Sequence, residues 1–266
     1  MTDAATQRIA ELETELAGLR AEMQDFSYTV SHDLRASLRH ILSYAQLVQE
    51  DAAHLLPPET RGFLDTISSS ASHMGLLMDG LMEWSRLGTV ALTPSPIGLQ
   101  PLLQELVTGL MQQHPHAQVD WQLQADLPAV QADAALLRAA LLCLLDNALK
   151  FTAQKDPRCV AVLAVVGTPD GSNGVAPGMV RIAVQDNGAG FNSALQSKLF
   201  HPFARLHTSK QFPGMGMGLA LTRKMAQRMG GQVQLQAAPD AGCTAYLTLP
   251  AADSRHGAAH CAICPA

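Results

Sequence analysis

Apolar residues in the N-terminal part of the chain recur at alternating steps of three and four, which is the spacing of helices that pack along an apolar seam. The first seam consists of Ile9, Leu12, Leu16, Leu19, Met23, Phe26 and Val30, and it continues through Leu34, Leu38, Ile41, Leu42 and Ala45. The second seam consists of Leu64, Ile67, Ala71, Met74, Met78, Leu81 and Ser85. Between the seams, Pro57 and Pro58 end one helix and begin the next. The pattern predicts two long helices joined as a hairpin.

A hairpin with one seam on each helix buries little apolar surface by itself. Two copies packed as a four-helix bundle bury both seams, so we expect a homodimer. A coiled-coil spacer explains the seams equally well. It gives no reason, however, for the adjacent His32 and Asp33, because His32 lies off the seam on an accessible face.

The rest of the chain alternates helical and strand-like segments, which predicts an α+β domain. Segment 88–99, with its glycines and prolines, is either a linker or an entering strand. We expect helices at 101–113, 133–151 and 219–228, and strands at 117–124, 160–166, 179–185, 232–237 and 244–249.

Composition and charge exclude several classes of protein. With 266 residues, 47% of them hydrophobic, the chain suffices for one or two globular domains. A net charge of −5 provides no global field that attracts nucleic acid. The most apolar run, 134–151, contains Arg138, Asp146, Asn147 and Lys150, so it predicts a core helix and no membrane span. Since the N-terminus lacks the apolar core of a secretory signal, we expect a cytoplasmic protein.

The cysteines, an odd number without a framework spacing, fit reduced thiols. In the C-terminal sequence HGAAHCAICPA, the residues His260, Cys261 and Cys264 are candidate metal ligands. A closed zinc site requires four ligands in a folded frame. We therefore expect residues 251–266 to be a disordered tail.

Four segments of the second part carry residues that suit a nucleotide. In LLCLLDNALKFT, Asn147 and Lys150 share one helix face, where an amide oxygen and an ammonium can hold hydrated Mg²⁺ and a phosphate oxygen. In VQDNGAGFN, Asp186 ends an apolar strand and is followed by glycines that let the backbone approach a ligand. Its carboxylate can accept a hydrogen bond from an adenine amine.

The other two segments continue the same pattern. In LFHPFARLH, Phe200 and Phe203 lie on one side of a turn, which is more typical of core packing, and Arg205 is free to reach phosphate. In FPGMGMGLAL, three glycines precede a helix that begins near Leu219, whose exposed amides and positive dipole end favour an anion. Each segment alone is a weak signal, whereas the four in this order indicate a nucleotide site.

With these segments the chain resembles a sensor histidine kinase of two-component signalling. SHDLR, DNALKFT, DNGAGF, FHPFARL and GMGMGLAL resemble the H, N, G1, F and G2 boxes of that family, over residues 22–250. SHDLRASLRHI and FARLH look most like the kinases attached to phytochromes. The implied fold is multi-domain, α and α+β: a coiled-coil signalling helix at 1–24, a dimerisation and histidine phosphotransfer domain at 25–90 that forms a dimeric four-helix bundle, a linker at 91–98, and a GHKL-type α/β sandwich that binds ATP at 99–250.

The resemblance also implies roles for individual residues. His32 is the phosphoacceptor, and Asp33 orients its ring and helps to accept its proton. Asn147 holds Mg²⁺, Lys150 holds phosphate and Asp186 selects adenine. The other implied ATP-binding residues are Gly188, Gly190, Phe203, Arg205, Gly214, Gly216, Gly218 and Leu219. The expected activity is ATP-dependent autophosphorylation of His32 and transfer of the phosphoryl group to an aspartate of a response regulator, with input from an upstream sensor domain or partner protein.

Four positions depart from the family pattern. Cys143 stands where a further asparagine is common, Ser37 where a proline kinks the helix, and Met215 where threonine is common. Ala36 replaces the threonine or asparagine that positions water for dephosphorylation, so we expect weak phosphatase activity. The departures leave open an alternative, a dimeric docking or phosphotransfer module with a degenerate ATP domain. A chaperone-like ATPase is disfavoured because it leaves His32 without a role.

Overall fold

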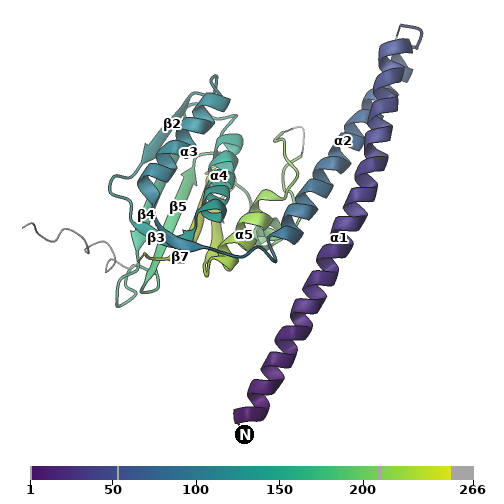
Figure 1. Ribbon diagram of the computed structural model, residues 1–266. Helices are drawn as coiled ribbons and strands as arrows, with labels where there is room; N and C mark the ends of the chain where they lie inside the picture. The colour runs from purple at the N-terminus through teal and green to yellow at the C-terminus, as the bar shows by residue number, and fades with distance from the viewer. Residues whose placement is uncertain (1, 53, 209–210, 253–266) are drawn as a thin grey trace, which may run out of the picture. The chain divides into compact units, whose positions relative to one another are not determined.

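The computed structural model describes residues 2–52, 54–208 and 211–252, which form two compact units that divide after Val90. In the first unit, α1 (Thr2–Ala52) and α2 (Pro58–Arg86) run side by side as a hairpin (Figure 1). Both predicted helices are thereby confirmed. Proline is favoured in the first turn of a helix, where its missing amide is not needed, and α2 begins at Pro58. The predicted tail lies outside the described residues, apart from Ala251 and Ala252.

The hairpin leaves much of its apolar surface open. Leu38 and Ala45 of α1 and Ala71 of α2 are buried. An exposed apolar face remains on the two helices, and it consists of Val30, Leu34, Ile41, Val48, Phe63, Ile67, Met74 and Leu81. Helix α1 runs without a break past Ser37, whose hydroxyl donates to the Asp33 carbonyl oxygen at 3.3 Å. Among the helices that the structure describes, none is long and apolar enough to cross a membrane.

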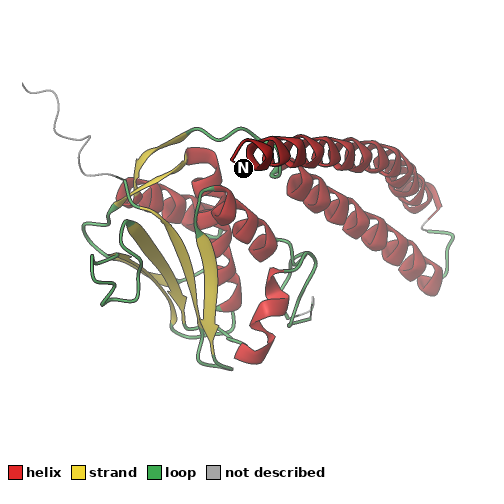
Figure 2. Ribbon diagram, turned by 90° about the horizontal axis from the view of Figure 1, so that it is seen from below, coloured by secondary structure: helices red, strands yellow, loops and turns green. Residues whose placement is uncertain are grey.

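The second unit contains a five-stranded mixed sheet with helices on one face. The strand order is β2 (Val119–Leu123), β4 (Arg158–Val166), β5 (Met179–Asp186), β7 (Cys243–Pro250) and β6 (Gln232–Ala237). Strand β2 is parallel to β4, and the other neighbours are antiparallel. Figure 2 shows α3 (Leu99–Gln113), α4 (Ala134–Phe151) and α5 (Gly218–Arg228) together on one side of the sheet.

Two short elements were not predicted, the strand β3 (Ala129–Asp133) and the 3₁₀ helix η1 (Ser193–Phe200). Strand β3 pairs antiparallel with β1 (Pro94–Gly98), so the strand interpretation of segment 88–99 is confirmed. Asp133 then caps α4, because its carboxylate accepts hydrogen bonds from the amides of Ala135 and Leu136 at 3.1 Å.

The alternation of side chains along β5 determines where the site lies. Val180, Ile182 and Val184 are buried, and β5 contacts α4. Successive side chains of a strand point to opposite faces, so Asp186 projects to the same side as these three. Cys243 pairs with Asp186 in the neighbouring strand β7 and shares that side. The Asp186 carboxylate, at the end of β5, therefore lies on the side of the sheet that faces α4.

Candidate functional site

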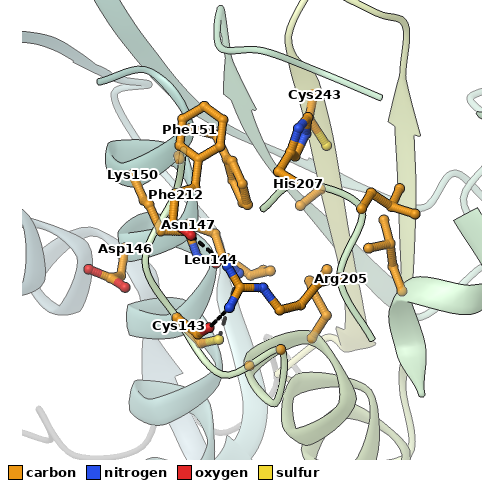
Figure 3. A pocket seen from close by; sticks show the side chains of 18 of the residues that line it. Cys143, Leu144, Asp146, Asn147, Lys150, Phe151, Arg205, His207, Phe212 and Cys243 are labelled. Atoms are coloured by element: carbon orange, nitrogen blue, oxygen red, sulfur yellow. Dashed lines mark hydrogen bonds between the residues drawn. The ribbon is translucent and has the colours of Figure 1, made fainter. Parts of the chain in front are cut away.

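A cavity of about 330 Å³ lies in the second unit, bounded by α4, the ends of β5 and β7, and the segment from Ala204 to Leu221 (Figure 3). It gathers most of the residues expected to bind a nucleotide, although they come from four separate segments. The predicted residues that line it are Asn147, Lys150, Asp186, Gly190, Arg205, Gly214, Gly216, Gly218 and Leu219. Gly188 and Phe203 do not line it.

Asp186 is held at the cavity wall by backbone amides. One carboxylate oxygen, Oδ1, accepts hydrogen bonds from Gly188 N at 2.8 Å and from Cys243 N at 3.3 Å. Burial raises the pKa of Asp186 to about 6, and the two amides act in the opposite direction. The carboxylate is therefore fixed in place and ionised near neutral pH, as an acceptor for an amine must be.

The glycines after Asp186 let the loop lie directly on its neighbours. A Cβ on Gly188 would come within 2.6 Å of the Phe151 carbonyl oxygen at the end of α4. Gly190 has a φ of +57°, and a Cβ there would collide with the Ala238 carbonyl oxygen. Gly188 thus shapes the site by close packing, without lining the cavity.

The cavity face of α4 carries Cys143, Asn147 and Lys150, one turn apart. Lys150 Nζ donates to Asn147 Oδ1 at 3.1 Å and lies 4.5 Å from the centroid of the Phe151 ring. Burial lowers the pKa of the Lys150 ammonium, while the Asp146 carboxylate opposes this. Burial also raises the pKa of the Cys143 thiol, so Cys143 is a neutral residue of the cavity wall. Its Sγ lies 3.9 Å from Asn147 Nδ2.

Two expectations about the segment after η1 were wrong. Arg205 is not free, because its guanidinium donates to the Gly214 carbonyl oxygen and, at 2.7 Å, to the Phe212 carbonyl oxygen. Phe203 does not pack with the core as Phe200 does. It has a φ of +65° and is 40% exposed, whereas Phe200 is 8% exposed. Arg205 therefore fastens residues 212–217, which we call the lid, by their backbone.

Further cavity residues were missed from the sequence. Phe151, His207 and Phe212 form an aromatic cluster, and Cys243 lies beside Asp186. All three rings lie inside segments that were already singled out, LLCLLDNALKFT, LFHPFARLH and FPGMGMGLAL, but the sequence does not indicate that they meet. Cys143, Cys159 and Cys243 are free thiols, in line with the expectation of reduced cysteines.

The candidate phosphoacceptor lies in the first unit, on α1. His32 Nδ1 is 3.3 Å from Asp33 Oδ1, and the two side chains are 66% and 77% exposed. One turn later, Arg35 forms an ion pair of 2.8 Å with Asp79 of α2. The histidine is thus accessible to another molecule or domain, and its neighbouring carboxylate is within hydrogen-bonding distance.

Comparison with known families decides the classification. Residues 22–89 match the His Kinase A (phospho-acceptor) domain, and residues 132–253 match the histidine kinase-, DNA gyrase B-, and HSP90-like ATPase. The chain belongs to the sensor histidine kinase family. The two matches fall on the two units, one on the hairpin with His32 and the other on the α/β unit with the cavity.

Several curated relatives are similar to this chain over most of its length. It is 28% identical to phytochrome-like protein Cph1 of Synechocystis over 92% of the chain, and 27% identical to the circadian input-output histidine kinase CikA of Synechococcus elongatus, also over 92%. It covers 31% and 32% of those two proteins, so it spans about a third of the length of these curated relatives.

Solved structures of histidine kinases share the fold. Full-length ShkA in complex with AMPPNP is 27% identical and has a TM-score of 0.59, covering 86% of this chain and 46% of ShkA. The histidine kinase AdeS of Acinetobacter baumannii, at 16% identity and a TM-score of 0.56, covers 83% of this chain and 98% of AdeS. This second likeness supports the fold alone.

Proposed function

We propose that the chain is an ATP-dependent protein histidine kinase that phosphorylates His32 and transfers the phosphoryl group to an aspartate of a response regulator. The observation that carries the proposal is the combination of an exposed His32 beside Asp33 with a cavity in which Asp186, Lys150 and the lid converge. Neither feature alone requires phosphoryl transfer, but together they provide an acceptor and a place for the donor.

The chemistry follows from the His32 geometry. Asp33 accepts a hydrogen bond from Nδ1–H of the neutral ring, which leaves the lone pair on Nε2 available for attack on the γ-phosphorus of ATP. A bond forms between Nε2 and phosphorus, the bond from phosphorus to the bridging oxygen breaks, and ADP leaves. The proton of the imidazolium passes to Asp33. Phosphoryl transfer needs mainly positioning and charge neutralisation, so few catalytic groups suffice.

Different cavity residues bind different parts of ATP. Asp186 accepts a hydrogen bond from the adenine amine, and Lys150 and the lid amides contact phosphate oxygens. Asn147 fits a Mg²⁺ ligand, because an amide oxygen has two lone pairs and one remains beside the bond from Lys150. The cation would neutralise the charge of the phosphates. The described residues contain no group of three acidic, histidine or cysteine side chains that would hold a metal alone.

A homodimer is part of the proposal. The exposed apolar face of α1 and α2 has the heptad spacing that a second hairpin would complement. The face near His32, including Arg35 and Arg39, is then the docking surface for the regulator. Since Ala36 offers no polar group for a water molecule, we expect weak phosphatase activity. The relatives named after phytochromes suggest a similar upstream sensor as the source of the signal.

One observation supports the alternative of a docking module with a degenerate ATP domain. Cys143 places a thiol in the cavity wall where the family commonly has an amide. Against this, Asn147, Lys150, Asp186 and the lid glycines are all present in one cavity.

Incubation of the chain with γ-labelled ATP and Mg²⁺ tests the proposal. We expect acid-labile, alkali-stable label on the protein, and none on His32→Gln. His40→Gln is the matched control, because His40 is an exposed histidine of the same helix and should leave the label unchanged. No label despite tight ATP binding would favour the docking module. No ATP binding would refute the nucleotide site.

A further inference from the structure

Three aromatic rings from separate segments meet at the wall of the nucleotide cavity. Phe151 ends α4, His207 follows the Arg205 segment, and Phe212 begins the lid. The ring centroids are 5.7 Å apart for Phe151 and His207, 5.2 Å for His207 and Phe212, and 5.0 Å for Phe151 and Phe212. Tilted and edge-on pairs at such distances are favourable beyond their burial. Figure 3 shows the cluster beside Lys150 and Asn147.

His207 makes a second contact, with the loop that follows Asp186. Its Nε2 lies 3.1 Å from the carbonyl oxygen of Gly190 in that loop. A nitrogen that faces a carbonyl oxygen carries the proton, so Nε2–H is the donor. His207 therefore contacts both residues 187–192, which follow the adenine-selecting carboxylate and which we call the adenine loop, and Phe212, the first residue of the lid.

The lid is fixed at Phe212 from two directions. The ring packs against His207 and Phe151, and the carbonyl oxygen accepts a hydrogen bond from Arg205 Nη2 at 2.7 Å. Phe212 is accordingly only 4% exposed. Farther along the lid, a Cβ on Gly216 would come within 2.6 Å of the Ala204 carbonyl oxygen and 2.9 Å of Arg205 Cγ, so the lid lies directly on residues 203–205. His207 follows two residues later and also contacts the adenine loop.

We propose that His207 is a positioning residue that couples the adenine loop to the lid and thereby slows the release of bound nucleotide. The inference rests on the proposed ATP site and adds a role to a residue that has none in it. Without the bond to Gly190, the lid keeps its packing but loses the link that His207 makes to the adenine loop, while the Phe151 carbonyl oxygen still accepts a hydrogen bond from Ala189 N at 3.1 Å. Without the ring, the connection to Phe212 is lost instead. Either change lets the lid open while the adenine is still bound.

Release of a fluorescent ADP analogue with Mg²⁺ from the full chain tests this, by stopped flow. His207→Phe keeps an aromatic ring and removes the hydrogen bond, and His207→Gln keeps a donor and removes the ring. His201→Ala is the matched control, because His201 lies in the same segment, is exposed and does not line the cavity. We expect release to be about fivefold faster in both His207 variants, with association changed by less than about twofold.

A purely structural role predicts a different result. It would lower the melting temperature and the fraction of active protein without changing the release rate of the folded molecules. The proposal is overturned if release from His207→Phe or His207→Gln equals that of the wild type, or if His201→Ala shows the same acceleration. Failure of the wild type to bind the ADP analogue would instead refute the ATP site itself, so the two failures are distinguishable.

Discussion

Replacing Asp186 with asparagine should make the α/β unit more stable while removing its affinity for ATP. In the proposed site this carboxylate must be ionised to accept a hydrogen bond from adenine, and its raised pKa reflects the free-energy penalty of ionising it in a partly buried position. The pKa of an unfolded aspartate is about 3.9, and burial raises the pKa of Asp186 to about 6 in the folded chain. This difference of about two pKa units corresponds to about 2–3 kcal/mol of folding free energy above pH 6.

The sign of the effect depends on pH. Below about pH 4 the carboxyl is protonated in both states, so the stability that it contributes is fully present. As the pH rises through about 6, the folded protein is forced to ionise a group that burial disfavours, and that stability is lost. An asparagine side chain in its place would resemble the protonated acid at every pH. We expect Asp186→Asn to be more stable than the wild type by about 2 kcal/mol at pH 7.5 and equal to it near pH 4.

Urea unfolding followed by Trp121 fluorescence measures this difference. Trp121 lies on β2 of the α/β unit, and a Trp84→Phe background removes the signal of the hairpin. The two units are compared separately because they need not unfold in one transition. If Asp186→Asn is less stable than the wild type at pH 7.5, or if the difference in stability is independent of pH, then ionising the buried carboxylate does not destabilise the folded unit.

Four further predictions concern other contacts. Gly218→Ala should weaken ATP binding because its Cβ would lie 2.6 Å from Cys143 Sγ, and Cys143→Ala in the same chain should restore the affinity, as titration with Mg·ATP would reveal. Arg205→Ala should speed amide hydrogen exchange at residues 212–216 at least about tenfold, since two hydrogen bonds to the lid are lost, whereas Arg138→Ala should not. Ile67→Glu should convert the dimer to a monomer in light scattering, whereas Ser69→Glu, an exposed position of the same helix outside the exposed apolar face, should leave it intact. The wild type should dephosphorylate its regulator slowly, and Ala36→Thr should accelerate this step; rapid regulator dephosphorylation by the wild type would contradict the role given to Ala36.

The elements that were predictable from the sequence are those in which one periodicity persists over many residues. The heptad seam predicted both α1 and α2, and the proline pair predicted where α2 begins. Strand β3 was missed because AVQAD lacks the alternation of apolar and polar residues seen in VDWQL of β2, and η1 was missed because a 3₁₀ helix does not have the period of 3.6 residues. The exposed apolar face was predictable only as part of the seam, since the sequence does not tell which seam residues pack within the hairpin.

The site was predictable as a set of motifs but not as a set of contacts. Asp186 and Lys150 were identified because their signals are local in the sequence. Asp186 is a carboxylate at the end of an apolar strand, and Lys150 lies three residues after Asn147 on one helix face. The expectation that Arg205 is free was wrong because its partners are backbone carbonyl oxygens, which every residue has and no motif marks. Phe203 has a positive φ, which is uncommon outside glycine and which the sequence does not indicate. His207 was overlooked because Phe151 and Phe212 approach it only in the folded chain.

The most direct test of the account compares nucleotide affinity and phosphoryl label in the same three proteins: the wild type, His32→Gln and Asp186→Asn. We expect that the wild type binds Mg·ATP and acquires label, that His32→Gln binds Mg·ATP equally well without acquiring label, and that Asp186→Asn does neither while remaining folded. Label retained on His32→Gln would place the phosphoacceptor elsewhere. Wild-type affinity in Asp186→Asn would show that the adenine is not held by the carboxylate at the end of β5.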